Sequence, residues 1–449
     1  MKNYERMLLD NQSIAFGAAD YGKMKKFIKT FNDADHTKWL ESYVNEYFFI
    51  GIENWPLFIK ERCQNVVAER ADGADGKFVI DTDDERVKAL VAELTGEATQ
   101  NLVYKHNNYE VKCMPLDPDE EMVQECISTN GVFLVLCLDG KRLQAVPCAD
   151  MAIESLLKRV GLDCTTMKRT STRGNRGALS LAEKVAWMNR AAQLYGQRTH
   201  VLVRGKVFFA GSENYVPLSM VEGLEKFEDV LSGTYEEMKF SNAMISHEYF
   251  VAEYRLHDEL IEGAFKQLLV DAGIAVDEVV AGARFHTSDT SDSKMTARCF
   301  IECKLRNHPT MRISLPDAVE MWHLGKASIE QWGDALAGFG KCFTESVDAI
   351  EKLGNIEIPD VPKVVLAIRE KYTWLPKKHT YAVAEEIIQS GKLAGTAIDV
   401  YIALNDVIQR QKDADGITPT AYVEAMAKMN TFLRLPYRKI ADGEEWEKI

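Results

Sequence analysis

The stretch KRTSTRGNRG, residues 168–177, concentrates the kinds of side chain that bind phosphate groups. It holds four cations, four short polar side chains and two glycines, and Ser180 and Glu183 behind it fit the capping box that begins a helix. Guanidinium groups donate forked hydrogen bonds to phosphate, glycine allows close approach of the backbone, and a helix start adds free N–H groups. Because neither GxxxxGK[ST] nor GxGxxG occurs, the pattern predicts contacts to a polyanion backbone rather than a mononucleotide site.

Charge is segregated along this chain of 449 residues. Between Lys158 and Lys206 eleven Lys or Arg accompany two acids, a local charge of +9 in a chain whose formal net charge is −14. A local cationic surface can bind nucleic acid in an acidic protein, because association depends on the field at the contacting surface. The nucleic-acid contacts are predicted to come from Lys168, Arg169, Arg173, Arg176 and Arg190. The alternative is a solvated loop whose cations pair with acids from elsewhere in the fold.

Four aromatic residues close to this segment in sequence could stack with bases of a single strand, namely Tyr195, Phe208, Phe209 and Tyr215. Phe208 and Phe209 are neighbours on a predicted strand and point to opposite faces, so at most one of them is exposed. Core packing is therefore favoured over stacking for these side chains.

No enzyme signature stands out. The loop HTSDTSDSK, residues 286–294, could hold a metal or an acid/base pair, but Asp289 and Asp292 are three apart and no bidentate Glu follows. A turn whose Ser and Asp side chains bond their own backbone explains the loop as well. HExxH, GxSxG and zinc-type cysteine spacing do not occur, and CFIEC, residues 299–303, reads as a buried strand. We expect no metal and no cofactor, and a binding protein rather than an enzyme.

The nine cysteines are scattered, and the N-terminus lacks the apolar core of a signal peptide, which predicts a reducing, cytoplasmic compartment. The longest apolar run, VFLVLCL at residues 132–138, is too short to cross a bilayer, so no membrane association is expected.

Hydrophobic periodicity predicts an α+β fold with antiparallel strands in the middle region and helical N-terminal and C-terminal regions. Trp39, Tyr43, Tyr47 and Phe48 recur at helical spacing, whereas Asp139-Gly140 and Gly205-Lys206 each separate two predicted strands of a hairpin. In the hairpin around Asp139-Gly140, the apolar strand at residues 132–138 is expected to lie in the centre of its sheet and the other strand nearer an edge. The predicted units are a helical region at 1–75, a small α+β unit at 76–150, an α+β core with the basic segment at 151–315 and a helical region at 316–449.

Three blocks of the sequence are WMNRAAQLYGQRTHVLVRGKVFFAGSENYVPLS at 187–219, GARFHTSDTSDS at 282–293 and GTAIDVYIALNDVI at 395–408. In this order they resemble phage/plasmid-like proteins, a family of undefined activity carried by mobile elements, and the resemblance spans roughly residues 150–412. Thr287-Ser288-Asp289 stands where the family usually has Asn-Ser-Glu, and Ile402 replaces an Asn of the C-terminal helix. The resemblance implies a mobile-element context and no catalytic residues.

Together these features predict a phage- or plasmid-encoded protein that binds nucleic acid, single-stranded DNA in replication or recombination. The alternative of a different class is a protein-binding or host-inhibitory factor with an acidic working surface. An enzyme acting at residues 286–294 is the third hypothesis.

Overall fold

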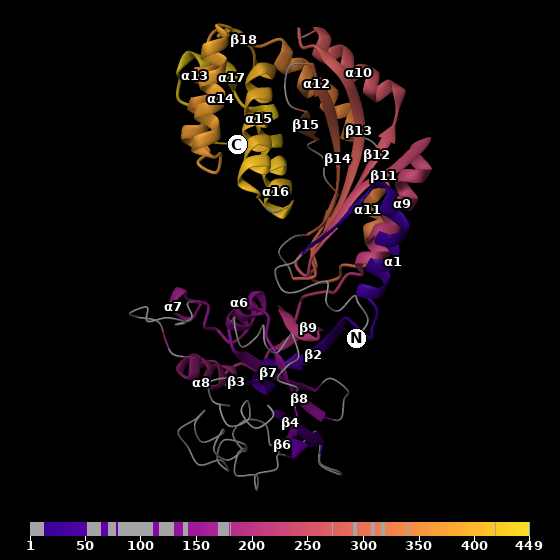
Figure 1. Ribbon diagram of the computed structural model, residues 1–449, viewed down its shortest axis with the longest axis vertical. Helices are drawn as coiled ribbons and strands as arrows, with labels where there is room; N and C mark the ends of the chain where they lie inside the picture. Colours follow the sequence, from indigo (N-terminus) through magenta and orange to yellow (C-terminus); the bar gives the residue numbers. More distant parts are fainter. Residues whose placement is uncertain are drawn as a thin grey trace.

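The computed structural model describes residues 13–51, 64–70, 78–79, 111–115, 130–137, 142–168, 179, 181–271, 273–290, 294–306, 310–315, 319–339, 342–417 and 419–448. Among these residues the predicted α+β class is confirmed, and all strand pairs of the sheets are antiparallel. Figure 1 shows two lobes, an upper one built on a long sheet and a lower one that holds the shorter sheets.

A seven-stranded sheet forms the upper lobe, in the order β1-β11-β12-β13-β14-β15, with β16 also pairing with β14. Its strands alternate between one apolar face and one polar face, because successive side chains of a strand point to opposite sides. The strands are β1 (Ile14–Gly17), β11 (Glu237–Ile245), β12 (Phe250–His257), β13 (Val276–Thr287), β14 (Met295–Leu305), β15 (Met311–Ser314) and β16 (Val319–Met321).

Helices cover the apolar face, with Phe285 and Phe227 meeting at 5.8 Å between ring centroids and Trp332 packing on Phe285 at 6.1 Å. These side chains belong to the largest hydrophobic core of the molecule. In Figure 1, α1, α9 and α11 lie on one side of the sheet and α15 and α16 on the other. The helices of the apolar face are α1 (Tyr21–Phe31), α9 (Met220–Thr234), α10 (Glu259–Asp271) and α11 (Ile329–Leu336).

The C-terminal region is helical, as the sequence predicts, apart from β16 and the short pair β17 (Glu357–Ile358) and β18 (Gly395–Thr396). Asn405 joins it to the sheet, since its amide donates to the Arg312 carbonyl at 2.6 Å and accepts from the Arg312 N–H at 3.3 Å. The helices are α12 (Cys342–Gly354), α13 (Val361–Lys371), α14 (Lys377–Ser390), α15 (Ala397–Asp415), α16 (Pro419–Met429), a 3-10 helix (Asn430–Arg434) and α17 (Tyr437–Asp442).

The lower lobe contains a second core, between two further sheets and the helices of residues 150–192. One sheet has the order β10-β9-β2 and the other β3-β7-β8-β4-β5, with β6 also pairing with β4. Its elements are β2 (Lys38–Tyr43), β3 (Phe48–Gly51), β4 (Gln64–Arg70), β5 (Phe78–Val79), β6 (Val111–Pro115), β7 (Val132–Cys137), β8 (Arg142–Pro147), α6 (Asp150–Arg159), α7 (Thr165–Lys168), α8 (Leu181–Ala192), β9 (Arg198–Arg204) and β10 (Lys206–Ser212).

The helical interpretation of residues 1–75 holds for α1 and for the short 3-10 helices Ala18–Asp20 and Val44–Glu46, and it is wrong where the strands β1, β2, β3 and β4 form. Residues Lys38–Tyr43 form β2, which pairs with β9, and Phe48–Gly51 form β3, which pairs with β7. The aromatic side chains of this segment have high strand propensity, and pairing with strands distant in sequence overrides their helical spacing. Residues 151–315 contribute elements to both lobes.

The strand pairs predicted around Asp139-Gly140 and Gly205-Lys206 are present. β9 and β10 are joined at Gly205, whose φ of +73° is the left-handed conformation that glycine adopts most easily. β7 pairs with β8, with Cys137 opposite Leu143, while Asp139-Gly140 itself lies outside the described residues. The expected order within the sheet is wrong, because β8 lies in the middle between β7 and β4 and β7 is nearer the edge.

Candidate functional site

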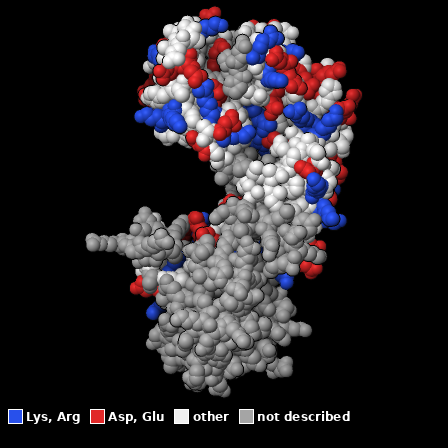
Figure 2. All heavy atoms as spheres, in the orientation of Figure 1, with Lys and Arg blue, Asp and Glu red and all other residues white. Residues whose placement is uncertain are grey.

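The predicted nucleic-acid contacts begin at the end of α7 and finish on α8. Lys168 is the last residue of α7, and Arg190 is exposed in the last turn of α8. Arg169, Arg173 and Arg176 lie between these helices, outside the described residues. In Figure 1, α6 and α7 lie on the side of the lower lobe that faces the C-terminal helices. Figure 2 shows Lys and Arg interspersed with Asp and Glu over the upper lobe.

The charge of +9 between Lys158 and Lys206 is not a single exposed patch. Lys184, Arg204 and Lys206 are buried. Two exposed cations of this segment have acidic partners, because Lys158 lies 3.2 Å from Glu154 and Arg198 lies 3.6 Å from Glu41. Burial lowers the pKa of Lys184, and the charge of Asp150 offsets part of this shift. Part of the cationic excess therefore belongs to the interior of the protein.

Core packing is confirmed for three of the four aromatic residues near this segment. Phe208, Phe209 and Tyr215 are buried, and Phe208 stacks on His247 with 3.8 Å between ring centroids. Tyr195 is 36% exposed. The buried rings are not available to stack with bases.

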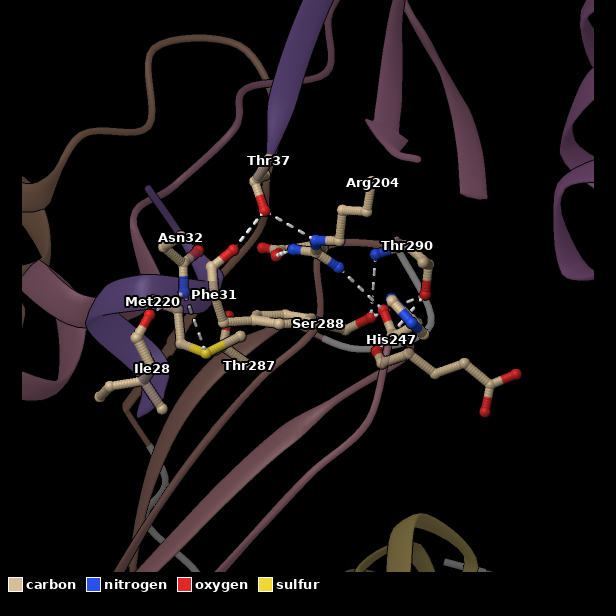
Figure 3. A network of polar contacts seen from close by, with 12 residues as sticks. Ile28, Phe31, Asn32, Thr37, Arg204, Met220, His247, Thr287, Ser288 and Thr290 are labelled. Carbon is tan, nitrogen blue, oxygen red and sulfur yellow. Dashed lines mark hydrogen bonds and ion pairs between the residues drawn. The ribbon is translucent and has the colours of Figure 1, made fainter. Parts of the chain in front are cut away.

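A buried ion pair between Arg204 and Asp289 joins the two lobes. Figure 3 shows Arg204 with its hydrogen bond to Thr37. Arg204 ends β9 of the lower lobe, and Asp289 follows β13 of the upper sheet. The Arg204 Nε donates to the Thr37 hydroxyl at 2.9 Å, and its guanidinium lies over the Phe31 ring at 4.2 Å. The Tyr215 hydroxyl donates to the Asp289 carbonyl at 3.0 Å. One guanidinium thus connects residues that are far apart in the sequence.

Residues 286–290, the first part of the loop at 286–294, are structural rather than an accessible site. His286, Thr287, Ser288, Asp289 and Thr290 are all buried, and the Thr290 N–H donates to the Ser288 hydroxyl at 3.2 Å. This is the side-chain-to-backbone turn that the sequence also allowed. Residues Thr287-Ser288-Asp289 therefore keep a polar role, whereas Ile402 packs against the hydrophobic core.

The polar face of the upper sheet carries a second set of cations, which the sequence analysis did not single out. Asn242, Glu253, Arg284 and Arg298 form one row across β11, β12, β13 and β14, because each is the register partner of the next. Each of the strands β12 to β15 contributes an arginine to this face. The recurrence of one Arg in four neighbouring strands is the sequence signal that could have indicated these cations. The set comprises Arg255, Arg284, Arg298, Arg312 and, at the start of β14, Lys294, with the carboxylates Glu253, Glu302 and Glu320.

Glu253 compensates two of these guanidinium groups. Its carboxylate accepts from Arg284 Nη2 at 2.6 Å and from Arg312 Nη1 at 2.8 Å, and the charges of both arginines hold its pKa far below the usual range despite burial. Arg312 also binds Glu302 at 2.8 Å and lies over the Phe300 ring at 4.2 Å. Gly282 makes room for that ring, since a Cβ there would lie 2.3 Å from Phe300.

The positive charge of Arg298 has fewer carboxylate contacts than the charges of Arg284 and Arg312 have. Among the described residues, the guanidinium of Arg298 has Glu320 as its hydrogen-bonding partner, at 3.5 Å, and Glu320 also pairs with Lys294. Its register partner on β13 is Arg284, a like charge directly opposite, which is unfavourable. Burial lowers the pKa of Arg298, and the charge of Glu320 offsets this shift while that of Arg284 adds to it.

A comparison with known protein families, curated proteins and solved structures finds no match. The resemblance to phage/plasmid-like proteins therefore stays a prediction. No helix within the described ranges has the length and apolar character needed to span a membrane. Those ranges also hold no group of three or more metal-ligating side chains. Both cysteines of CFIEC are buried, as expected, but Cys299 is disulfide-bonded, which the sequence did not indicate.

Proposed function

We propose that this chain binds nucleic acid through the phosphate backbone, as a phage- or plasmid-encoded protein that holds single-stranded DNA in replication or recombination. In this proposal it acts in the cytoplasm of a bacterial host. Lys168, Arg169, Arg173, Arg176 and Arg190 supply the contacts. Each contact is electrostatic and independent of sequence, because phosphates carry no base information.

The observation that carries the proposal is the position and freedom of Arg190. It is exposed on α8 and has no acidic partner among the residues that the structure describes. The other end of the basic segment, Lys168, ends α7, which lies on the side of the lower lobe that faces the C-terminal helices (Figure 1). We expect cations between two lobes to suit a flexible polyanion, because field lines concentrate at a concave surface.

Replacement of Arg169, Arg173 and Arg176 together by Ala should flatten the dependence of oligonucleotide binding on salt. Each phosphate contact of a single strand contributes a slope of about 0.7 on a log–log scale, so three lost contacts lower the slope by about two. Affinity should fall similarly for unrelated sequences. The measurement is titration of a labelled single-stranded oligonucleotide at several salt concentrations, with a thermal melt of each variant.

The matched control replaces Lys23, Lys239 and Arg306 together by Ala, which removes the same charge from sites that are already ion-paired. Lys23 lies 2.7 Å from Asp20, Lys239 lies 2.7 Å from Glu237, and Arg306 lies 3.1 Å from Asp277. If both triple variants lose the same slope, net charge alone explains binding and the basic segment is not the site. If the wild type does not bind at low salt, nucleic acid is excluded and a protein partner becomes the leading hypothesis.

A further inference from the structure

The polar face of the upper sheet has more cations than carboxylates. Five cations, the four arginines of β12 to β15 and Lys294, lie with three carboxylates, and Glu253 and Glu320 each serve two of the cations. Partly buried charges interact more strongly than exposed ones, because less water screens them. The uncompensated positive charge therefore favours an anion at this face.

Arg298 is the place on this face where an anion finds free donors. A guanidinium has five N–H donors, and among the described residues that of Arg298 uses one contact, to Glu320 at 3.5 Å. Its side chain is 15% exposed, so part of it is open to solvent. By contrast, Arg284 and Arg312 are held by Glu253 at 2.6 and 2.8 Å.

An exposed aromatic ring is linked to Arg298 through Lys294 and Glu320. Trp322 follows β16 and is 61% exposed, and the Lys294 ammonium lies 4.3 Å from the centre of its ring. Lys294 in turn pairs with Glu320, the residue that contacts Arg298. Trp322, Lys294, Glu320 and Arg298 thus form one chain of contacts at the end of the sheet nearest the lower lobe.

We propose that Arg298 and Trp322 form a nucleotide subsite for single-stranded nucleic acid, in which Arg298 binds a backbone phosphate and Trp322 stacks on a base. Cations interleaved with aromatic faces are the combination that binds single strands without sequence preference. Phe208, Phe209 and Tyr215 are buried and offer no surface for stacking. Trp322 supplies an exposed aromatic surface in their place. This assignment rests on the proposed function, and it places a second contact region on the upper lobe.

The test uses two probes, inorganic phosphate and a single-stranded oligo(dT), with the variants Arg298→Gln, Arg298→Lys and Trp322→Ala. Phosphate should raise the melting temperature of the wild type relative to chloride at equal ionic strength, because a ligand of the native state stabilises it. Arg298→Gln should abolish this shift, Arg298→Lys should retain part of it, and Trp322→Ala should leave it unchanged. Arg306→Gln is the control, since Arg306 is exposed and already pairs with Asp277 at 3.1 Å.

With oligo(dT), Arg298→Gln should lower the salt slope by about 0.7, one phosphate contact. Trp322→Ala should weaken binding about tenfold with the slope unchanged, because stacking does not release counterions. Circular dichroism and a melt of each variant without ligand confirm that it is folded.

The outcomes separate this subsite from the proposed function. Oligo(dT) binding that is identical in the wild type, Arg298→Gln and Trp322→Ala would overturn the subsite and leave nucleic-acid binding by the basic segment intact. A phosphate shift that needs Arg298, with no oligo(dT) binding by the wild type, would overturn the nucleic-acid assignment and the proposed function together, and the anion would then be free phosphate or a small phosphorylated molecule.

Discussion

Replacing Asp289 by Ala should lower the free energy of unfolding by about 3–5 kcal/mol, because it leaves the charge of Arg204 buried without a counterion. The side chain of Arg204 is fully buried, and its remaining hydrogen bonds among the described residues are to the neutral Thr37 hydroxyl at 2.9 Å and the His247 carbonyl at 3.4 Å. Neither neutral acceptor replaces a carboxylate. The measurement is urea denaturation followed by fluorescence and circular dichroism.

Two further variants show whether the loss comes from the unpaired charge. Arg204→Met combined with Asp289→Ala should recover part of the stability, since removal of both charges leaves none uncompensated. Glu41→Ala breaks the exposed pair with Arg198, whose side chain is 52% exposed, and should change stability by about 0.5 kcal/mol or less. A double variant as unstable as Asp289→Ala would show that lost packing, and not an unpaired charge, determines the effect.

The features that the sequence predicted correctly depend on residues close together in the chain. The turn at Gly205 needs a positive φ, and the strands on either side of it are adjacent, so local pattern suffices. The buried face of α8 also follows a local pattern, because Leu181, Val185 and Met188 lie at helical spacing and are all buried.

The features that were missed depend on pairing between distant residues. Residues Lys38–Tyr43 form a strand because β9, about 160 residues later, offers an edge to pair with. The Arg204–Asp289 pair joins residues 85 apart. Local spacing carries no information about either contact, because the β2–β9 pairing forms only when the lower lobe folds and the ion pair only when the two lobes have assembled.

The cationic face of the upper sheet could not be predicted from the sequence, because its prediction requires the register of several strands. Arg284 and Arg298 meet because β13 and β14 pair in one register, and bulges near Asn242 and Glu278 shift which side chains share a face. A slip of one residue would move every side chain of a strand to the opposite face. Strand composition predicted buried antiparallel strands but could not show that their arginines converge.

Stability should fall with decreasing pH between about 6.5 and 4 because of His286. Burial, with the charges of Arg284 and Arg298, lowers the pKa of His286 from 6.5 to about 4. Between these values the unfolded chain binds a proton that the native state does not, so native stability present above pH 6.5 is lost as the pH falls. At about 1.4 kcal/mol per pH unit the total loss is about 3 kcal/mol.

His286→Gln should remove this part of the pH dependence, because Gln does not titrate. The comparison is the slope of unfolding free energy against pH from 7 to 4, so that any constant loss caused by the substitution cancels. Burial also lowers the pKa of His323, which contributes its own slope in both proteins. His257→Gln is the matched control, since His257 lies on the neighbouring strand β12 with its side chain 48% exposed. It measures how far the loss of an imidazole side chain alone changes the slope. If His286→Gln keeps the wild-type slope, His286 is protonated in the native state and the neighbouring arginines do not exclude its charge.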